Sequence, residues 1–236
     1  MKCAITISYN GAEFFGLQSQ KNGEITVIGT IEKALKKIKI DSKIVASGRT
    51  DSGVHATAQV CHIDLPPYWD DLEKLKYTLN KILPQSIHIK KVEQKDDSFH
   101  ARYSAKRRVY RYIIKEGTTN PFQEKFISFL ESVDFKKIEQ NIKLFLGEHD
   151  FRYFMKSGSD VKSTIRTIFK AFAYRYKGYI ILNFEANGFL RTQIRLMVAA
   201  LLSLNDTQII ELLQCRKKYK LKPADGNGLY LAKVKY

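Results

Sequence analysis

The chain has 236 residues, 44% of them hydrophobic, which is enough to bury a core as one large domain or two small ones. Lysine and arginine outnumber aspartate and glutamate by 40 to 24, a formal net charge of +16, and residues 101–236 carry +14 of it. The excess favours a polyanionic partner such as nucleic acid, although a solvated basic surface would give the same totals.

Several classes of protein are disfavoured by what the sequence lacks. The three cysteines are far apart and form no C-x-x-C pair, and the five histidines form no H-E-x-x-H cluster. There is also no P-loop and no G-x-G-x-x-G after a strand, so we expect chemistry by side chains alone, with no cofactor and no metal. The N-terminal MKCAITISYN is not a signal peptide and no apolar run approaches about 18 residues, which predicts a soluble, cytoplasmic protein with no membrane partner.

The first hundred residues predict a β-α-β-β-α-β order of elements. Residues 2–9 alternate as a strand, and Ile28, Ile31 and Leu35 mark an amphipathic helix over about 26–39. Two strands follow, then a helix that stops at Pro84, then a further strand. Their predicted ranges are 44–47, 57–65, 72–82 and 87–93.

The same order is predicted again after a linking stretch, residues 95–106. Residues 107–115 read as a strand with basic and aromatic residues interleaved, and a helix is expected to end at Gly147. Paired strands, two helices and a last strand are then predicted at 164–176, 179–186, 189–204, 207–215 and 229–236.

These patterns predict an α+β protein. We expect two tandem ferredoxin-like (β-α-β-β-α-β) halves, residues 1–103 and 104–236, with mainly antiparallel sheets that face a central cleft. The second half, being the more basic, would bind nucleic acid.

The stretch GRTDSGVHA, residues 48–56, lies between two predicted strands. Its glycines allow a tight loop, and Asp51 stands two residues from Arg49, which could keep the carboxylate ionised. Such a loop could present a nucleophile or base, but an ordinary polar turn has the same composition.

Two other positions could carry function. Tyr110 lies among arginines on a predicted strand and could stack on a nucleobase, or be an ordinary edge-strand tyrosine. Arg195 borders the apolar stripe of the 189–204 helix, where an arginine usually needs an acidic partner. Asp51 and Glu185 are both candidates for that partner. The tail PADGNGLYL favours a structural role.

Beyond these single residues, GRTDSGVHATAQV closely resembles the signature of the tRNA pseudouridine synthases of the TruA family. Other segments resemble the family in the expected order, and they are SYNGAEFFGLQSQ, NKILPQSI, FHARYSAKRRVYRY, FLGEHDF, NGFLRTQIRLMVAAL and PADGNGLYL. The chain departs from the family pattern at Leu17, at Gln193 and Ile194, at Ala199, and through an extra Asn227.

This resemblance implies an isomerase that converts uridine to pseudouridine at tRNA positions 38, 39 and 40, in the anticodon stem-loop. It implies Asp51 as nucleophile, Arg49 entering the RNA to displace the base, Tyr110 stacking on that base, and Arg195 pairing with Asp51. His55 and Leu229 are implied as further substrate-binding positions, and a homodimer is implied as the assembly.

Two rival functions differ in what Asp51 must do. A non-catalytic RNA-binding protein of the same fold would have no need of a carboxylate facing phosphates. A pseudouridine synthase with a different target uridine would need Asp51 equally.

Overall fold

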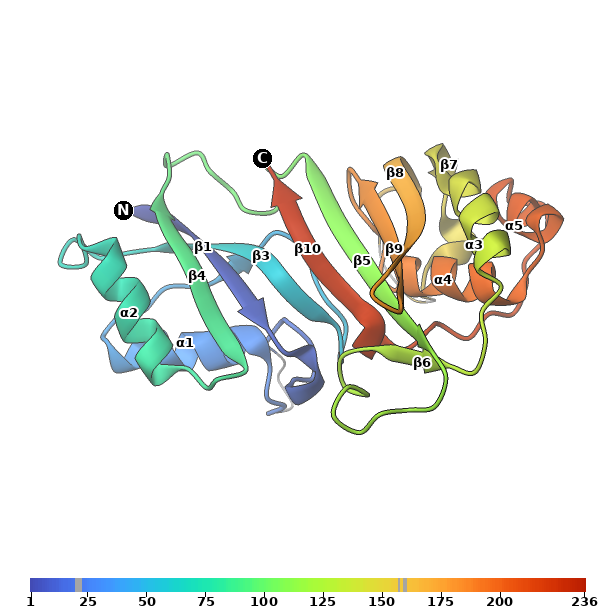
Figure 1. Cartoon of the computed structure of the whole chain (residues 1–236). Coiled ribbons are helices and arrows are strands. Elements are labelled where there is room, and N and C mark those ends of the chain that lie inside the picture. The colour runs from blue at the N-terminus through green and yellow to red at the C-terminus, as the bar shows by residue number, and fades with distance from the viewer. Residues whose placement is uncertain (20–22, 157, 159–160) are drawn as a thin grey trace. The chain divides into compact units, whose positions relative to one another are not determined.

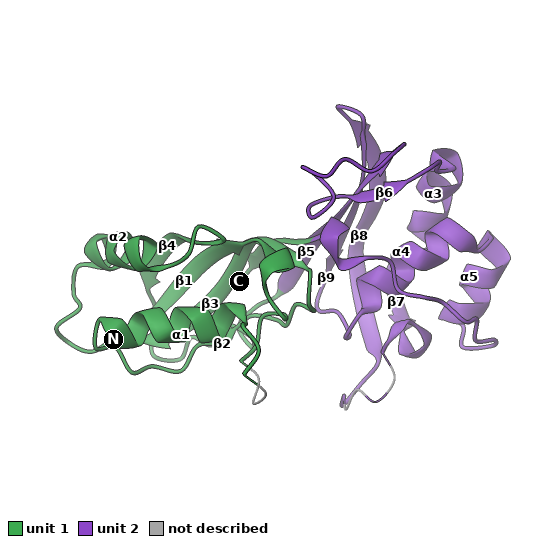
Figure 2. Ribbon diagram, turned by 90° about the horizontal axis from the view of Figure 1, so that it is seen from below, with its two compact units in different colours: residues 1–106, 230–236 green, residues 107–229 purple. Residues whose placement is uncertain are grey.

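The computed structural model describes residues 1–19, 23–156, 158 and 161–236, and the chain divides into two compact units. Unit 1 comprises residues 1–106 and 230–236, and unit 2 comprises residues 107–229 (Figure 2). Gln20, the last residue of the opening SYNGAEFFGLQSQ segment, lies outside the described residues.

Unit 1 follows the predicted order of strands and helices (Figure 1). Its elements are β1 Lys2–Tyr9, α1 Val27–Lys37, β2 Val45–Ala46, β3 His55–Asp64, α2 Leu72–Ile82 and β4 Ile87–Gln94. β1 lies between β4 and β3, both antiparallel to it, and β2 pairs antiparallel with β3. The helices α1 and α2 cover one face of this sheet (Figures 1 and 2).

The helices of unit 1 begin and end where their sequences dictate. The Thr26 hydroxyl accepts from the Gly29 N–H at the start of α1, and the Asp71 carboxylate accepts from the Lys74 N–H at the start of α2. α2 ends before Pro84, which cannot continue a helix. The apolar stripe of α1 is buried, with Ile31 and Leu35 at 0% exposure.

Unit 2 contains the strands β5 to β9 and the helices α3 to α5 (Figure 1). Its elements are β5 Arg107–Glu116, β6 Ser128–Leu130, α3 Phe135–Asn141, β7 Gly147–Asp150, β8 Ile165–Tyr176, β9 Tyr179–Ala186, α4 Gln193–Ser203 and α5 Asp206–Leu213. β5, β9, β8 and β7 pair antiparallel in that order, and β6 adds to β5 in parallel. The protein is therefore an α+β fold whose strands pair mainly antiparallel.

The structure corrects the predicted elements in four places. The helix predicted to end at Gly147 is α-helical only to Asn141 and continues as a 3-10 turn over Ile142–Phe145. The short strands β6 and β7 were not predicted. α4 begins four residues later than expected, because Thr192 has a positive φ of 67° and the Gln193 N–H donates to the Leu190 carbonyl, which closes a turn over residues 190–193. The last strand, β10 Leu229–Lys235, belongs to unit 1 from Tyr230 onward, since Tyr230 and Leu231 pair in parallel with His55 and Ala56 of β3.

No helix in the described ranges is long and apolar enough to cross a bilayer.

A buried histidine joins the linking stretch to the sheet of unit 1. His62 of β3 is 7% exposed, and its Nδ1 accepts from the Ala101 N–H at 3.0 Å. The His100 ring lies 4.9 Å from the His62 ring, and the His100 Nδ1 accepts from Arg102 N–H and Tyr103 N–H. Burial, His100 and Lys2 lower the pKa of His62 below its ordinary 6.5, against a smaller opposing effect of Asp64.

This lowered pKa predicts acid sensitivity of the free energy of unfolding. Because neutral His62 is favoured in the folded state, its contribution is complete above about pH 6.5 and is lost as pH falls through the folded-state pKa. We expect His62→Asn, whose amide oxygen can accept from Ala101 but does not titrate, to lose less stability than the wild type between pH 7.5 and pH 5.5. Urea unfolding at the two pH values measures this, and equal losses would contradict the prediction.

Candidate active site

The loop that carries Asp51 joins β2 to β3, and a buried glutamine fixes its stem. Gln59 is 0% exposed, accepts from the Ser47 hydroxyl at 2.6 Å and donates to the Gly48 carbonyl at 2.9 Å. One side chain on β3 therefore holds the residues where the loop leaves the sheet.

The opening segment of the chain lies against the same loop. The Tyr9 and Thr50 hydroxyls are hydrogen-bonded at 2.7 Å in a buried environment, and the Leu17 N–H donates to the Thr50 carbonyl at 3.2 Å. On the other side of Asp51, the Ser52 hydroxyl donates to the Phe14 carbonyl at 3.3 Å. Both neighbours of Asp51 are thus bonded to residues that lie more than thirty positions away in the sequence.

The end of the loop is packed against Gly11 without a gap. A Cβ atom at Gly11 would lie 2.0 Å from the Val54 carbonyl oxygen, so only glycine fits. The Gly11 N–H donates to Nδ1 of His55 at 3.0 Å, and the His55 ring stacks on Tyr230 with centroids 4.7 Å apart.

Asp51 itself begins a tight turn. The Val54 N–H donates to the Asp51 carbonyl at 3.2 Å, and Gly53 takes a positive φ of 77°. Asp51 is partly exposed, Arg49 is exposed, and Thr50 between them is buried at 7%. The loop therefore presents a carboxylate and a guanidinium group on a backbone that is held from both ends.

His55, expected to bind substrate, is a buried residue of unit 1. Its side chain is 1% exposed, and its Nδ1 and one ring face are engaged by Gly11 and Tyr230. The imidazole therefore presents almost no surface to solvent.

The other three predicted residues lie in unit 2. Tyr110 of β5 pairs with Phe184 of β9, is 7% exposed and packs edge-to-face on Phe189 with centroids 5.3 Å apart. Arg195 in the first turn of α4 donates from Nε to the Ala224 carbonyl at 2.5 Å, and the Ala224 N–H donates back to the Arg195 carbonyl at 3.1 Å. The arginine is thus fixed to the tail.

Glu185, one of the two expected partners of Arg195, forms an ion pair with Arg107. The two side chains lie 3.0 Å apart and Glu185 is 3% exposed, while the Arg107 guanidinium also stacks over the Phe169 ring at 4.3 Å. Asp51 lies in unit 1 and Arg195 in unit 2.

The tail turn packs tightly on β5. The Tyr112 hydroxyl donates to the Asp225 carbonyl at 3.0 Å, and a Cβ at Gly228 would lie 2.9 Å from the Tyr112 ring. Burial raises the pKa of Tyr112 to about 12, so it is a neutral donor at pH 7. Asn227 donates to the carbonyls of Glu124 and Ile127, which ties the tail to the loop after β5, and Leu229 is 5% exposed.

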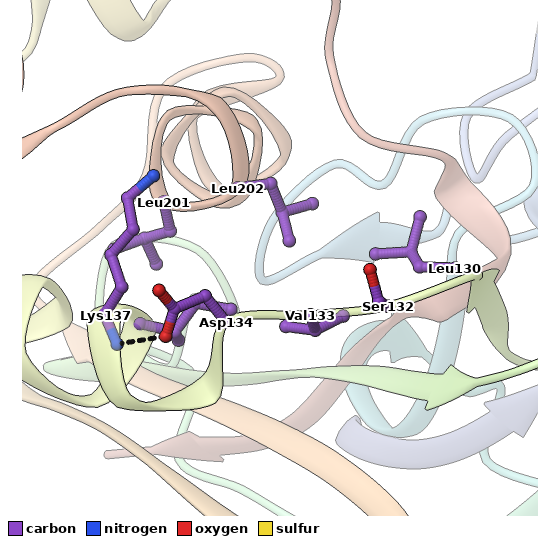
Figure 3. Close-up of a pocket in the computed structure, with 8 residues that line it drawn as sticks. Leu130, Ser132, Val133, Asp134, Lys137, Leu201 and Leu202 are labelled. Carbon is purple, nitrogen blue, oxygen red and sulfur yellow. Dashed lines mark hydrogen bonds between the residues drawn. The ribbon is translucent and has the colours of Figure 1, made fainter.

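A pocket of about 190 Å³ elsewhere in unit 2 is unrelated to these residues. It lies where β6, α3 and α4 meet (Figure 3). Its lining consists of Leu130, Ser132, Val133, Asp134, Lys137, Ile138, Leu201 and Leu202, and the Asp134 carboxylate accepts the Lys137 N–H as the cap of α3. The candidate site is therefore a surface loop and its neighbours, not this cavity.

The sequence predicted a functional loop at residues 48–56, but it did not predict the residues that hold this loop. Tyr9, Gly11 and Gln59 are ordinary residues in their local context, and only the family-like opening segment hinted at a role for the first two. Among the residues described, no group of three or more His, Cys, Asp or Glu side chains could hold a metal ion.

A partly exposed carboxylate on a rigid loop, in a strongly basic α+β protein, is suited to side-chain chemistry on a nucleic acid. The sequence profile of the tRNA pseudouridine synthase family matches residues 5–104 and 142–236, so Asp51, Arg195 and Leu229 lie inside the match and Tyr110 outside it. The chain is 38% identical over 241 residues to tRNA pseudouridine synthase A of Campylobacter jejuni, covering 100% of both chains. It is also 38% identical to the protein of that name from Wolinella succinogenes, covering 98% of this chain and 92% of the other.

The chain therefore belongs to the tRNA pseudouridine synthase A (TruA) family, whose members are isomerases. Among solved structures, a crystal structure of a Cbf5-Nop10-Gar1 complex matches with a TM-score of 0.39 and 14% identity. That match covers 85% of this chain and 45% of the other.

The close packing at Gly11 predicts a large effect of one methyl group. We expect Gly11→Ala to push the loop from its position, to destabilise the fold by about 1–3 kcal/mol and to lower activity at least about tenfold. Gly48→Ala is the matched control, because a Cβ there meets nothing within 4 Å. Thermal unfolding and initial rates measure both, and equal behaviour of the two variants would show that the packing does not matter.

Proposed function

We propose that this protein isomerises uridine to pseudouridine at positions 38, 39 and 40 of the tRNA anticodon stem-loop, with Asp51 as the nucleophile. The observation that carries the proposal is the loop of residues 47–54, whose hydrogen bonds to Gln59, Tyr9, Phe14 and Leu17 hold Asp51 at a partly exposed position. Membership in the family supports the reaction and tRNA as substrate.

The reaction needs no other reactant. The bond between ribose C1′ and N1 of uracil breaks, the uracil turns, and a bond forms between C1′ and C5. C5 loses a proton, N1 ends with one, and the carboxylate is regenerated. A carboxylate held in place before the substrate arrives avoids the entropic cost of finding the attacking geometry.

The target base must leave its stack before a side chain can reach the glycosidic bond, at a cost of a few kcal/mol. Phosphate contacts by the basic second half of the chain can offset that cost. In this proposal Arg49, exposed on the loop, enters the RNA and displaces the base, and Tyr110 stacks on it.

Arg195 is proposed to pair with Asp51. Its support is that the hydrogen bonds to Ala224 hold the arginine backbone and Nε in place, and that a guanidinium pairs well with a carboxylate. Leu229, at the end of the fixed tail turn, is proposed to contact the base through its apolar side chain.

The finer architecture is also a proposal. We infer two tandem ferredoxin-like halves, residues 1–103 and 104–236, that face a central cleft. The β-α-β-β-α-β order of β1 to β4 supports the first half, whereas residues 230–236 of the second half belong to unit 1. A cytoplasmic homodimer working with side chains alone, without cofactor or metal, completes the proposal. It would place the basic residues of two copies within reach of one tRNA.

Replacing the carboxylate tests the mechanism. We expect Asp51→Asn to leave no detectable pseudouridine on an unmodified tRNA transcript, while the dissociation constant for that tRNA changes less than about threefold, because the amide cannot act as nucleophile. Asp41→Asn, at an exposed position in the same unit, should keep wild-type activity. Full activity of Asp51→Asn would exclude the mechanism, and inactive wild-type protein that still binds tRNA would favour a non-catalytic binder.

The target positions are tested in cells. In a strain lacking this gene, pseudouridine should disappear from tRNA positions 38, 39 and 40 and persist elsewhere, and the wild-type gene should restore it. Sequencing-based pseudouridine mapping measures this. Persistence at all three positions would assign the enzyme to a different uridine.

A further inference from the structure

His55 is the first residue of β3 and follows the Asp51 loop directly. Its Nδ1 accepts a hydrogen bond from the Gly11 N–H at 3.0 Å. A backbone N–H can only donate, so Nδ1 carries no proton and the neutral ring is protonated at Nε2. The hydrogen bond therefore selects one tautomer of His55.

The His55 ring is also held from its face. Tyr230 of β10 stands opposite His55 in the parallel pairing with β3, and the two rings stack at 4.7 Å with 18° between their planes. With 1% exposure, the imidazole has no freedom to turn toward solvent. It is a fixed acceptor pointing at the opening turn.

Gly11 couples the position of the His55 ring to that of the Asp51 loop. The glycine lies so close to the Val54 carbonyl that a Cβ would be 2.0 Å away, and Val54 is bonded through its N–H to the Asp51 carbonyl. A shift of Gly11 therefore shifts the turn from residue 51 to residue 54. His55 acts on Asp51 through Gly11 and Val54 without touching it.

We propose that His55 is a positioning residue, whose Nδ1 holds Gly11 against the Asp51 turn and so sets the orientation of the carboxylate. The proposal rests on the proposed function, and it replaces the expected contact between His55 and RNA. Its role is to hold geometry, so its loss affects the chemical step and not the binding of tRNA.

Two amide variants test which of the two ring nitrogens of His55 is needed. The Asn amide oxygen can stand where Nδ1 stands, whereas the longer Gln places its oxygen near Nε2 and leaves Gly11 without its acceptor. We expect His55→Gln to lower kcat at least about tenfold with KM changed less than about twofold, because misplacing a reacting group by about 1 Å costs up to about 100-fold. His55→Asn should keep kcat within about threefold of the wild type.

His62 provides a matched control on the same strand. It is also buried, and its Nδ1 also accepts from a backbone N–H, that of Ala101. It lies seven residues further along β3, about 23 Å away at strand spacing. We expect His62→Gln to leave kcat unchanged although it removes an equivalent hydrogen bond.

Amide hydrogen exchange tests the proposal without an activity assay, so the proposal stays testable if catalysis fails for another reason. Amide hydrogen exchange of the peptide that contains Gly11 should be slow in the wild type and in His55→Asn, and faster in His55→Gln. Circular dichroism and thermal unfolding confirm that each variant is folded.

Three results would overturn the proposal. Wild-type kcat in His55→Gln would show that the acceptor is unnecessary, and a raised KM at constant kcat would make His55 an RNA contact. An equal loss of kcat in His55→Gln and His62→Gln would show that His55 contributes only to the general stability of the fold. An inactive wild-type protein would defeat the proposed function instead, and the exchange result for Gly11 would still decide how His55 acts on the loop.

Discussion

The candidate site depends on the contact between the backbone of the opening turn and the backbone of the Asp51 loop. At Gly11 the two backbone segments are too close for any side chain, because a Cβ atom on Gly11 would lie 2.0 Å from the Val54 carbonyl oxygen. A contact between backbones is stiffer than one between side chains, because no rotamer can relax it. The orientation of Asp51 therefore depends on the position of residues 10 to 17. That position is set in turn by β1, the strand that these residues follow.

This construction uses neutral hydrogen bonds rather than charges. The Tyr9, Ser47, Thr50 and Ser52 hydroxyls and the Gln59 amide fix the loop, and each such bond is worth about 1 kcal/mol net. A site that must receive a polyanion benefits from this, since ion pairs within the loop would compete with phosphate for the same cations. The buried polar network holds the backbone that carries Arg49 and Asp51.

The elements with a clear local sequence pattern were predicted close to their observed bounds. The stripe of Ile28, Ile31 and Leu35 located α1 to within two residues at each end, and the paired strands predicted at 164–176 and 179–186 correspond to β8 and β9. The strands β6 and β7, at three and four residues, are too short for periodicity to reveal. The placement of β10 in unit 1 depends on pairing between Tyr230 and His55, which lie 175 positions apart, and no window of sequence contains that information.

The same limit explains why the residues of the loop were predictable and their supports were not. Asp51 is identified by its loop chemistry and by the family-like motif, both contained in nine consecutive residues. The burial of His55 arises from Gly11, 44 positions earlier, and from Tyr230 in the last strand. A histidine beside a candidate nucleophile suggests a substrate contact when it is seen alone. Its Nδ1, occupied by a backbone N–H, and its ring, stacked on a tyrosine, make it part of the scaffold that gives the carboxylate its direction.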